Sequence, residues 1–539
     1  MKPPSPMPEP SPGANAGAPE VASGSALVDA LARELVVAGE GPVELVQTHI
    51  SWVLLGRTQA IKLKKPVRLP FVDFSTAERR CAAARDELRL NRRLAPSLYL
   101  EVRALTGSAD APRQSGEGPV IDCVLVMRRF AAGALLAERL AAGRLGVDEL
   151  DRLAVRIAAF HRGLPGAPAT SGYGTPARVA QDAADVLERI TAAWQAAGRD
   201  DAALRERFVP VRDWVLAQPA RLGPHWRRRL AGGHVRECHG DLHLANTVVL
   251  DDGEVTAFDC IEFDPALRWT DTMSDVGFLT MDLHAHGRRD LAACFLDAYL
   301  RETGDHAGLA VLRHYQVYRA LVRTLVGALA TRASGAREAS GPDYLECASR
   351  LVGESGRARL LITHGLSGSG KSRLAARLQD ASGAVRLRSD VERKRLHGLA
   401  PLDRPGAATA ALYAPAATER TFAYLADAAT AALAGGFAVI VDAAFLRRAE
   451  RERMRAVARA CGVPFTILHC EAPPALLRQR LAERAARADD PSDADARVLA
   501  NQERSQEALD DAERAMTIAV DTAAPIDIDA LARHWALSR

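Results

Sequence analysis

The feature that most constrains the fold of this chain is the stretch GLSGSGKS at residues 365–372. Its glycines allow the backbone to curl, so that successive N–H groups can surround a phosphate at the start of a helix. Such a loop needs a strand before it and a helix after it. The apolar run ARLLITHG precedes it and the amphipathic run SRLAARLQ follows. The sequence therefore predicts a nucleotide phosphate-binding loop within an α/β domain.

More apolar strands follow this loop and alternate with helices, which favours a parallel α/β sheet. They are the segments VRLRSD, FAVIVDAAF and FTILHCEA. We expect this domain to span residues 353–539.

The sequence before residue 353 has a different pattern. Strand-like runs and one long helix come first, and helical stretches fill most of the remainder, interrupted by the hairpin TVVLDDGEVTAFDC with its DDG turn. We expect a small strand-rich lobe and a helical lobe, together spanning residues 26–352. Residues 1–25 are rich in Pro, Gly, Ala and Ser and are predicted to be a disordered tail.

Composition supports two soluble domains. A chain of 539 residues is too long for one ordinary core, and 48% hydrophobic with 25% charged residues is normal for a globular protein. The net charge of +3 gives no reason to expect a nucleic-acid or membrane surface. No apolar run approaches the roughly 18 residues that span a bilayer. The eight cysteines form no CxxC pair. We therefore predict a cytoplasmic protein with neither disulfides nor a zinc site.

The first segment with several candidate catalytic residues is CHGDLHLANTVVL at residues 238–250. Asp241 and Asn246 lie five residues apart, and Asp259 ends the hairpin that follows. Phosphoryl transfer requires an aligned acceptor hydroxyl and divalent cations on the phosphate oxygens. One carboxylate to orient the hydroxyl, together with an amide and a second carboxylate to hold metal, meets those requirements.

Upstream, the strand QAIKLKK resembles the protein-kinase strand that ends in a lysine for the nucleotide phosphates. Glu87, in the following helix, is its expected ion-pair partner. Strand alternation places Lys62 and Lys64 on the same face, so the choice between the two lysines stays open.

The motif HGDLHxxN with its downstream Asp resembles the aminoglycoside phosphotransferase family, relatives of protein kinases that phosphorylate small molecules. The resemblance covers roughly residues 26–345 and implies a bilobal protein-kinase-like fold. The GxGxxG loop of protein kinases is missing from HISWVLLGRTQ. The roles that the resemblance implies are catalytic base for Asp241, Mg²⁺ ligands for Asn246 and Asp259, ATP-phosphate contact for Lys62 paired with Glu87, and adenine hinge near Met127.

Four acids follow the second motif: Glu262, Asp264, Asp271 and Asp275. They could attract a polyamine-like acceptor. Alternatively they are helix caps and ion pairs that brace the lobe.

The second set of candidates belongs to the phosphate-binding loop. The backbone at Gly365, Ser367, Gly368, Ser369 and Gly370 would cradle the phosphates. Lys371 would reach the β and γ oxygens, and the Ser372 hydroxyl would face Mg²⁺. Asp442 ends a strand, where a metal-binding carboxylate belongs. A strand-end cap is the alternative for Asp442.

Beyond the loop, SDVERKRL resembles small P-loop kinases of the gluconate kinase and polynucleotide kinase kind. The resemblance implies that Asp390, at the end of its strand, binds or deprotonates the acceptor hydroxyl. The helix LLRQRLAERAAR resembles the lid of these kinases, which implies that Arg480 and Arg484 contact the transferring phosphate. A solvated basic helix face is the alternative.

As a whole, the chain resembles bacterial two-domain proteins that pair an aminoglycoside-phosphotransferase-like domain with a P-loop kinase-like domain. The resemblance implies a bifunctional phosphotransferase that uses ATP and Mg²⁺ to phosphorylate hydroxyl groups of small molecules, with no nucleic-acid or membrane partner. Two alternatives stay open. One domain could be a nucleotide-binding regulatory or ATPase module for the other, or the P-loop domain could be a polynucleotide-end kinase.

Overall fold

The computed structural model describes residues 18–69, 72–168, 170–198, 202–334, 341–403, 409–487, 492 and 494–538. The chain divides into two compact units. The first contains Met1–Leu135 and Val248–Pro265, and the second contains Leu136–Thr247 and Ala266–Arg539. The described residues form an antiparallel sheet with helices, followed by a parallel sheet with helices, as the sequence predicts.

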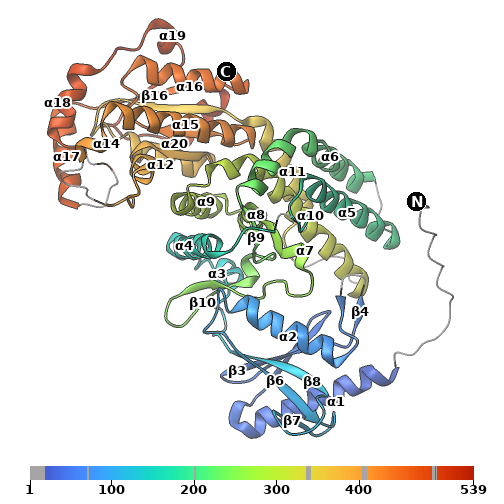
Figure 1. The fold of residues 1–539 in the computed structure, drawn as a ribbon. Coiled ribbons are helices and arrows are strands. Elements are labelled where there is room, and N and C mark those ends of the chain that lie inside the picture. The colour runs from blue at the N-terminus through green and yellow to red at the C-terminus, as the bar shows by residue number, and fades with distance from the viewer. Residues whose placement is uncertain are drawn as a thin grey trace. The chain divides into compact units, whose positions relative to one another are not determined.

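A six-stranded antiparallel sheet forms the first unit, in the order β1-β2-β3-β8-β6-β7 (Figure 1). Strand β8 lies near its centre, and its Val124 and Val126 are fully buried. The strands are β1 Glu44–Gln47, β2 Ser51–Leu55, β3 Gln59–Lys64, β6 Tyr99–Gly107, β7 Pro112–Gln114 and β8 Asp122–Arg128, with a separate pair, β4 Arg68–Leu69 and β5 Val72–Asp73. The unit also holds most of the hairpin β10 Thr247–Val249 and β11 Val255–Ala257.

One face of this sheet is covered by helix α1, Ala18–Leu35, whose Leu27 and Leu31 pack against Ile61 and Val124. Helix α1 is followed by a short π-helix, η1, Val36–Glu40. The predicted disordered tail is wrong at its end, because α1 already begins at Ala18. Residues 1–17 lie outside the described part of the chain.

The opposite face of the sheet carries helix α2, Ala77–Asn91, which is capped by Thr76. A disulfide joins Cys81 of α2 to Cys123 of β8, with their Cα atoms 5.0 Å apart. The expectation of no disulfide is therefore wrong for this pair. Packing of the helix on the sheet brings together two cysteines 42 residues apart, a pairing that no local spacing motif reveals.

Helices make up the first part of the second unit, around the almost wholly buried helix α8. The last helix of this lobe, α11, packs on α8 and α10. Their bounds are α3 Leu136–Ala141, α4 Val147–Gly163, α5 Pro176–Ala196, α6 Ala202–Ala231, η2 Leu244–Asn246, α7 Pro265–Arg268, α8 Thr272–Ala285, α9 Arg289–Thr303, η3 His306–Gly308, α10 Leu309–Ser334, α11 Tyr344–Glu354 and η4 Ser355–Arg357. Strands β9 Val235–Glu237 and β12 Trp269–Asp271 form a small antiparallel pair.

The remainder of the second unit is a five-stranded parallel sheet in the order β14-β15-β13-β16-β17, flanked by helices (Figure 1). All five residues of the central strand β13 are buried. The strands are β13 Leu360–His364, β14 Val385–Arg388, β15 Val439–Asp442, β16 Phe465–Glu471 and β17 Thr517–Asp521. The helices are α12 Lys371–Ser382, α13 Ser389–Leu396, α14 Thr409–Leu412, α15 Pro415–Ala434, α16 Arg448–Cys461, α17 Pro474–Arg487, α18 Ala496–Ser505, α19 Asp511–Arg514 and α20 Ile528–Leu537.

Within the second unit, the helical part and the P-loop part pack directly on each other. The hydroxyl of Tyr424 on α15 donates to the carbonyl of Gly304 (2.9 Å) and lies 2.9 Å from Nδ1 of His306. The guanidinium of Arg395 on α13 donates to the carbonyl of Arg301 at the end of α9 (2.5 Å). In the described part of the chain, no helix has the length and apolar character required to cross a membrane.

Candidate active sites

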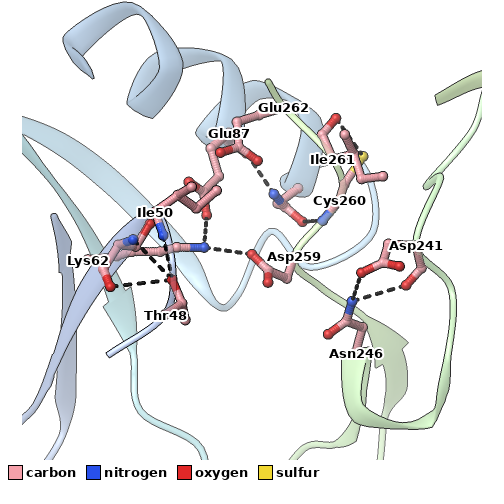
Figure 2. Close-up of polar contacts among 12 residues, drawn as sticks. Thr48, Ile50, Lys62, Glu87, Asp241, Asn246, Asp259, Cys260, Ile261 and Glu262 are labelled. Carbon is pink, nitrogen blue, oxygen red and sulfur yellow. Dashed lines mark hydrogen bonds and ion pairs between the residues drawn. The ribbon is translucent and has the colours of Figure 1, made fainter. Parts of the chain in front are cut away.

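The predicted lysine, its partner and the hairpin carboxylate meet in the first unit. The ammonium of Lys62 lies 2.7 Å from Oε1 of Glu87 and 2.6 Å from Oδ1 of Asp259 (Figure 2). Strand β3 supplies the lysine and α2 supplies the glutamate, while Asp259 follows the hairpin β10–β11. These three side chains are brought together as the sequence predicts.

Lys64 projects to the same side of β3 but has different partners. It lies 2.6 Å from Oε2 of Glu87 and donates a hydrogen bond to Glu262. Lys64 is buried together with both carboxylates, so it braces the unit internally. Lys62, which alone of the two contacts Asp259, is the one that the geometry favours for the phosphates.

Opposite charges set the pKa values of this cluster. Burial by itself would lower the pKa of Lys62, but Asp259 and Glu87 outweigh it and raise that pKa well above its ordinary value. Burial would raise the pKa of Glu87, yet the two lysines lower it to about 2. Lys62 and Glu87 are therefore both ionised at neutral pH.

Asp259 is held in place through its backbone. Its φ of 63° lies in the left-handed region, which a non-glycine residue adopts only when its surroundings impose it. Its amide donates to the Tyr99 hydroxyl (3.0 Å), and the next amide, of Cys260, donates to the Asn91 side chain (2.8 Å). Met127, the predicted hinge residue, lies at the end of β8 and pairs with Ala60 and Tyr99.

The HGD loop of the second unit is shaped by a buried carboxylate. Asp275 on α8 accepts the amides of His239 (2.7 Å) and Gly240 (2.9 Å) and lies 3.2 Å from Nε2 of His161. Gly240 has a φ of 83°, and a Cβ there would lie 2.9 Å from the carbonyl of Leu267. Only glycine fits this turn, which explains why a glycine precedes Asp241.

Asp241 and Asn246 contact each other as their spacing predicts. The Asn246 amide donates to the carboxylate of Asp241 (2.9 Å) and to its carbonyl (3.0 Å) (Figure 2). The side chain of Asp241 is 35% exposed, and His243 lies 3.4 Å from it. Burial raises the pKa of Asp241, but His243 and His239 outweigh it and lower the pKa to about 2. Asp241 is therefore a carboxylate at neutral pH, open to an incoming group.

The acids after the motif have bracing roles. Asp271 caps α8 and pairs with Arg229 at 2.6 Å. Asp275 holds the HGD loop, and Glu262 pairs with Lys64 in the first unit. For these three, helix caps and ion pairs account for the acidic run.

The GLSGSGKS loop lies between β13 and α12 and has the curled backbone that its glycines predict. Gly365, Gly368 and Gly370 all have positive φ. A Cβ at Gly365 would lie 2.5 Å from the carbonyl of Cys470, and one at Gly368 would lie 2.7 Å from that of Leu477. The hydroxyl of Ser369 is buried without a hydrogen-bond partner in the described residues. The backbone has no space for a side chain at Gly365 and Gly368, and the buried Ser369 hydroxyl is available as a hydrogen-bond donor. Both features suit the binding of a phosphate chain.

Side chains around the loop supply hard oxygen donors, which Mg²⁺ prefers. The Ser372 hydroxyl donates to Oδ1 of Asp442 (3.1 Å), and Asp442 lies at the end of β15 as predicted. Oδ2 of Asp442 is held by Arg386 on β14 at 2.9 Å. Lys371 donates to the carbonyl of Leu366 (2.7 Å), and burial lowers its pKa. The sequence did not indicate the ion pair with Arg386.

A cavity of about 1300 Å³ extends from this loop, large enough for a nucleotide and an acceptor. Asp390 lines it from the first turn of α13, not from the end of a strand, because the helix already begins at Ser389. Arg393 also lines it and donates to the carbonyl of Leu412 (3.0 Å) and to Thr418 (3.1 Å). Asp390, Ser372 and Asp442 thus share one cavity, as the sequence predicts.

The two predicted lid arginines on α17 line the same cavity. Arg480 donates to the carbonyl of Gly368 (3.3 Å) and to Thr522 (2.9 Å). Arg484 donates to the carbonyl of Ala494 (2.7 Å). Arg480 therefore supports the phosphate-binding loop directly. Thr522 and Gln502, whose side chain accepts the Ser367 amide at 2.8 Å, were missed because no motif marks them.

Both halves match known families. The model of the phosphotransferase enzyme family matches residues 71–321, and that of an AAA domain matches residues 360–509. With the geometry above, these matches define a two-domain protein, in which the first domain resembles the phosphotransferase enzyme family and the second is a P-loop domain that resembles an AAA domain.

Relatives share the whole two-domain chain. The uncharacterized protein Rv2004c of Mycobacterium tuberculosis is 30% identical over 512 residues, covering 91% of this chain and 94% of the relative. A protein of Mycobacterium bovis matches with the same identity and coverage. The chain belongs to the family of these two-domain proteins.

Solved kinase structures also align with each half. A choline/ethanolamine kinase family protein from Mesorhizobium loti is 14% identical and covers 61% of this chain and 92% of its own, with a TM-score of 0.33. The APS kinase of Mycobacterium tuberculosis is 20% identical and covers 33% and 95%, with a TM-score of 0.24. Because both TM-scores are below 0.5, the fold assignment rests on the family matches and the observed topology.

Proposed function

We propose that this protein is a bifunctional phosphotransferase that moves the γ-phosphate of ATP to hydroxyl groups of small molecules at two independent sites. The observation that carries the proposal is the presence, in two unrelated parts of the chain, of a set of groups suited to phosphoryl transfer. One is Lys62 with Glu87 and Asp259, and Asp241 with Asn246. The other is the phosphate loop with Ser372, Asp442 and Asp390 around one cavity.

In the first site, Lys62 would contact the nucleotide phosphates, with Glu87 holding its ammonium in place. Met127 would lie beside the adenine. Asp241, ionised at neutral pH, would accept a hydrogen bond from the acceptor hydroxyl and orient it. Asn246 and Asp259 would hold Mg²⁺, which neutralises charge on the phosphate oxygens when it is bound with ATP.

In the second site, the amides of Gly365, Ser367, Gly368, Ser369 and Gly370 would hold the phosphates. Lys371 and the arginines Arg480 and Arg484 would add positive charge. Ser372 and Asp442 would hold Mg²⁺, and Asp390 would orient the acceptor. The compartment that we propose is the cytoplasm, where the Cys81–Cys123 disulfide would be kept reduced.

Separate inactivation of the two sites tests this function. The full chain is assayed for acceptor-dependent ADP release with sugars, amino alcohols, nucleosides and antibiotics, as wild type, Asp241→Asn and Lys371→Ala. We expect one group of acceptors to lose turnover only in the first variant, by roughly 10²–10⁴-fold, and another only in the second. If one variant keeps every acceptor-dependent activity, the domain that it disables is not a working kinase.

A regulatory role for the P-loop domain is the second candidate, favoured by one contact. Helix α13 carries Asp390 on the cavity, while its Arg395 is bonded to the end of α9 in the helical part. Nucleotide in the cavity would then alter turnover at the first site. In that case Lys371→Ala changes the turnover of the acceptors that react at the first site, and no acceptor loses turnover in this variant alone.

A polynucleotide-end kinase is the remaining alternative. It requires salt-sensitive binding of labelled oligonucleotides, which the near-neutral net charge of +3 does not favour.

A further inference from the structure

A second cavity, of about 700 Å³, lies within the second unit, between the helical part and the P-loop part. The residues that line it differ from those that line the cavity at the phosphate-binding loop. Helices α9, α10 and α20, the short helix η4 and strand β14 all contribute to it. Six arginines line it: Arg289, Arg313, Arg357, Arg359, Arg386 and Arg533.

Fewer carboxylates than arginines line this cavity, so the negative charge does not neutralise the positive charge. Three acids line it, and one of them, Glu354, is shared by Arg289 (2.8 Å) and Arg313 (3.4 Å). Asp297 accepts a hydrogen bond from Gln379, and no partner of Asp529 is found in the described residues. Arg386 is engaged by Asp442.

Three further arginines, Arg357, Arg359 and Arg533, have no carboxylate partner in the described part of the chain. Arg359 donates only to carbonyls, those of Arg357 (3.3 Å) and Trp535 (2.5 Å). Positive charge therefore accumulates on this cavity.

Buried polar groups of the lining also lack partners. Arg313 is 6% exposed, and its Nε has no acceptor among the described residues. Its guanidinium stacks on the ring of Phe437 at 4.5 Å, which fixes its position. Trp535 is 1% exposed, and its indole N–H is likewise unsatisfied in the described structure. A buried donor without an acceptor is costly, and a bound anion would supply the acceptors.

Burial, with a smaller contribution from neighbouring arginines, lowers the pKa of two groups that line this cavity. Burial together with Arg313, Arg289 and Arg350 lowers the pKa of His284, another lining residue, to about 3. Burial lowers the pKa of Arg313 as well, and Glu354 does not restore it. A negative ligand would relieve both effects.

We propose that this arginine-lined cavity is a binding site for a small molecule that carries one or more phosphate groups. Guanidinium groups pair with phosphate oxygens in a bidentate manner, and Arg313, Arg357, Arg359 and Arg533 supply them from three different elements and the segment before β13. The volume suits a ligand the size of a sugar bisphosphate or nucleotide. This site is distinct from both catalytic sites and does not depend on their proposed activity.

The test is calorimetric titration of the full chain with inorganic phosphate, fructose 1,6-bisphosphate and citrate. The informative variant is Arg357→Gln with Arg533→Gln, since both side chains are exposed and neither has a carboxylate partner among the described residues, so folding should persist. We expect fructose 1,6-bisphosphate to bind the wild type and to bind this double variant about tenfold or more weakly. Lys371→Ala should keep the wild-type affinity, because it alters only the P-loop.

The matched control is Arg455→Gln with Arg459→Gln on α16, which removes the same charge outside this cavity. It should bind like the wild type. Four results would overturn the proposal: no binding of either phosphate compound to the wild type, equal loss in the control, loss in Lys371→Ala, or tighter binding of citrate than of fructose 1,6-bisphosphate. Thermal unfolding of each variant confirms that it is folded.

Discussion

At the scale of single residues, the carboxylate of Glu87 has the most demanding environment in the first unit. It is fully buried, and its two oxygens lie against Lys62 and Lys64. Each ammonium group also contacts a second carboxylate, so the cluster contains four ion pairs, two of which involve Glu87. Glu87 therefore contributes to stability and to the proposed nucleotide site, and substitutions of the two lysines should separate these two contributions.

The first prediction distinguishes the two lysines. In a Lys371→Ala background, which silences the P-loop, Lys62→Met should weaken binding of MgADP at least about tenfold, since Lys62 alone also faces Asp259. Lys64→Met should leave that affinity within about threefold but lower the free energy of unfolding by roughly 3–5 kcal/mol, because it removes the ammonium that pairs with the buried carboxylates of Glu87 and Glu262. Calorimetry and urea unfolding measure the two effects. The opposite pattern would assign the phosphate role to Lys64.

The second prediction concerns pH. The pKa of Glu87 is lowered from 4.5 to about 2 in the folded chain. A lowered pKa means that its stabilisation is fully present above about pH 4.5 and is lost as the pH falls toward 2. The difference in unfolding free energy between wild type and Glu87→Gln should therefore shrink as the pH falls from 5 to 3. A difference independent of pH would show that the carboxylate is not ionised in the folded protein.

At the scale of elements, the phosphate-binding loop depends on glycines that no other residue can replace. Gly365 lies against the carbonyl of Cys470, which belongs to the neighbouring strand β16. The loop is therefore shaped by the sheet as well as by its own sequence.

The third prediction follows from this contact. Gly365→Ala should abolish MgADP binding at the second site and lower the free energy of unfolding by about 2 kcal/mol or more, since both the φ of 138° and the approach to Cys470 disfavour a side chain. Gly353→Ala in helix α11 is the control, because no atom lies within 4 Å of the added Cβ. It should bind normally and be as stable as the wild type or more so. Normal binding by Gly365→Ala would refute the role assigned to the loop backbone.

The parts of both sites that could be predicted are those that are local in sequence. The HGD loop with Asn246, and the GLSGSGKS loop with its strand and helix, each place their chemistry within a few residues. The contact of Asp275 with the HGD loop, and that of His161 with Asp275, were not predicted, because both depend on the packing of α8 and α4. The Arg386–Asp442 pair joins two strands 56 residues apart, and the short strands β1, β7 and β17 carry too little pattern to stand out.

At the scale of the whole molecule, the P-loop part of the second unit is packed against the helical part. Gly435, at the end of α15, lies so close to the carbonyl of Leu309 that a Cβ would clash with it. Tyr424 adds hydrogen bonds to the same region. These contacts should make the two parts unfold together.

The fourth prediction tests this cooperativity. Calorimetric unfolding of the wild type should show one transition for the second unit, and Gly435→Val should split it into two or lower its midpoint by several degrees. Thr430→Ala, an exposed position on the same helix whose hydroxyl bonds only within the helix, should leave the profile unchanged. Two transitions in the wild type would mean that the two parts fold independently.

Arg386 connects the two cavities of the second unit. Its side chain lines the arginine-lined cavity and forms an ion pair with Asp442, which lines the cavity at the phosphate-binding loop. A substitution of Arg386 should therefore affect both cavities. An enzymologist who removes the guanidinium to study one pocket will also have freed a carboxylate in its neighbour, and must measure both before assigning the phenotype to either.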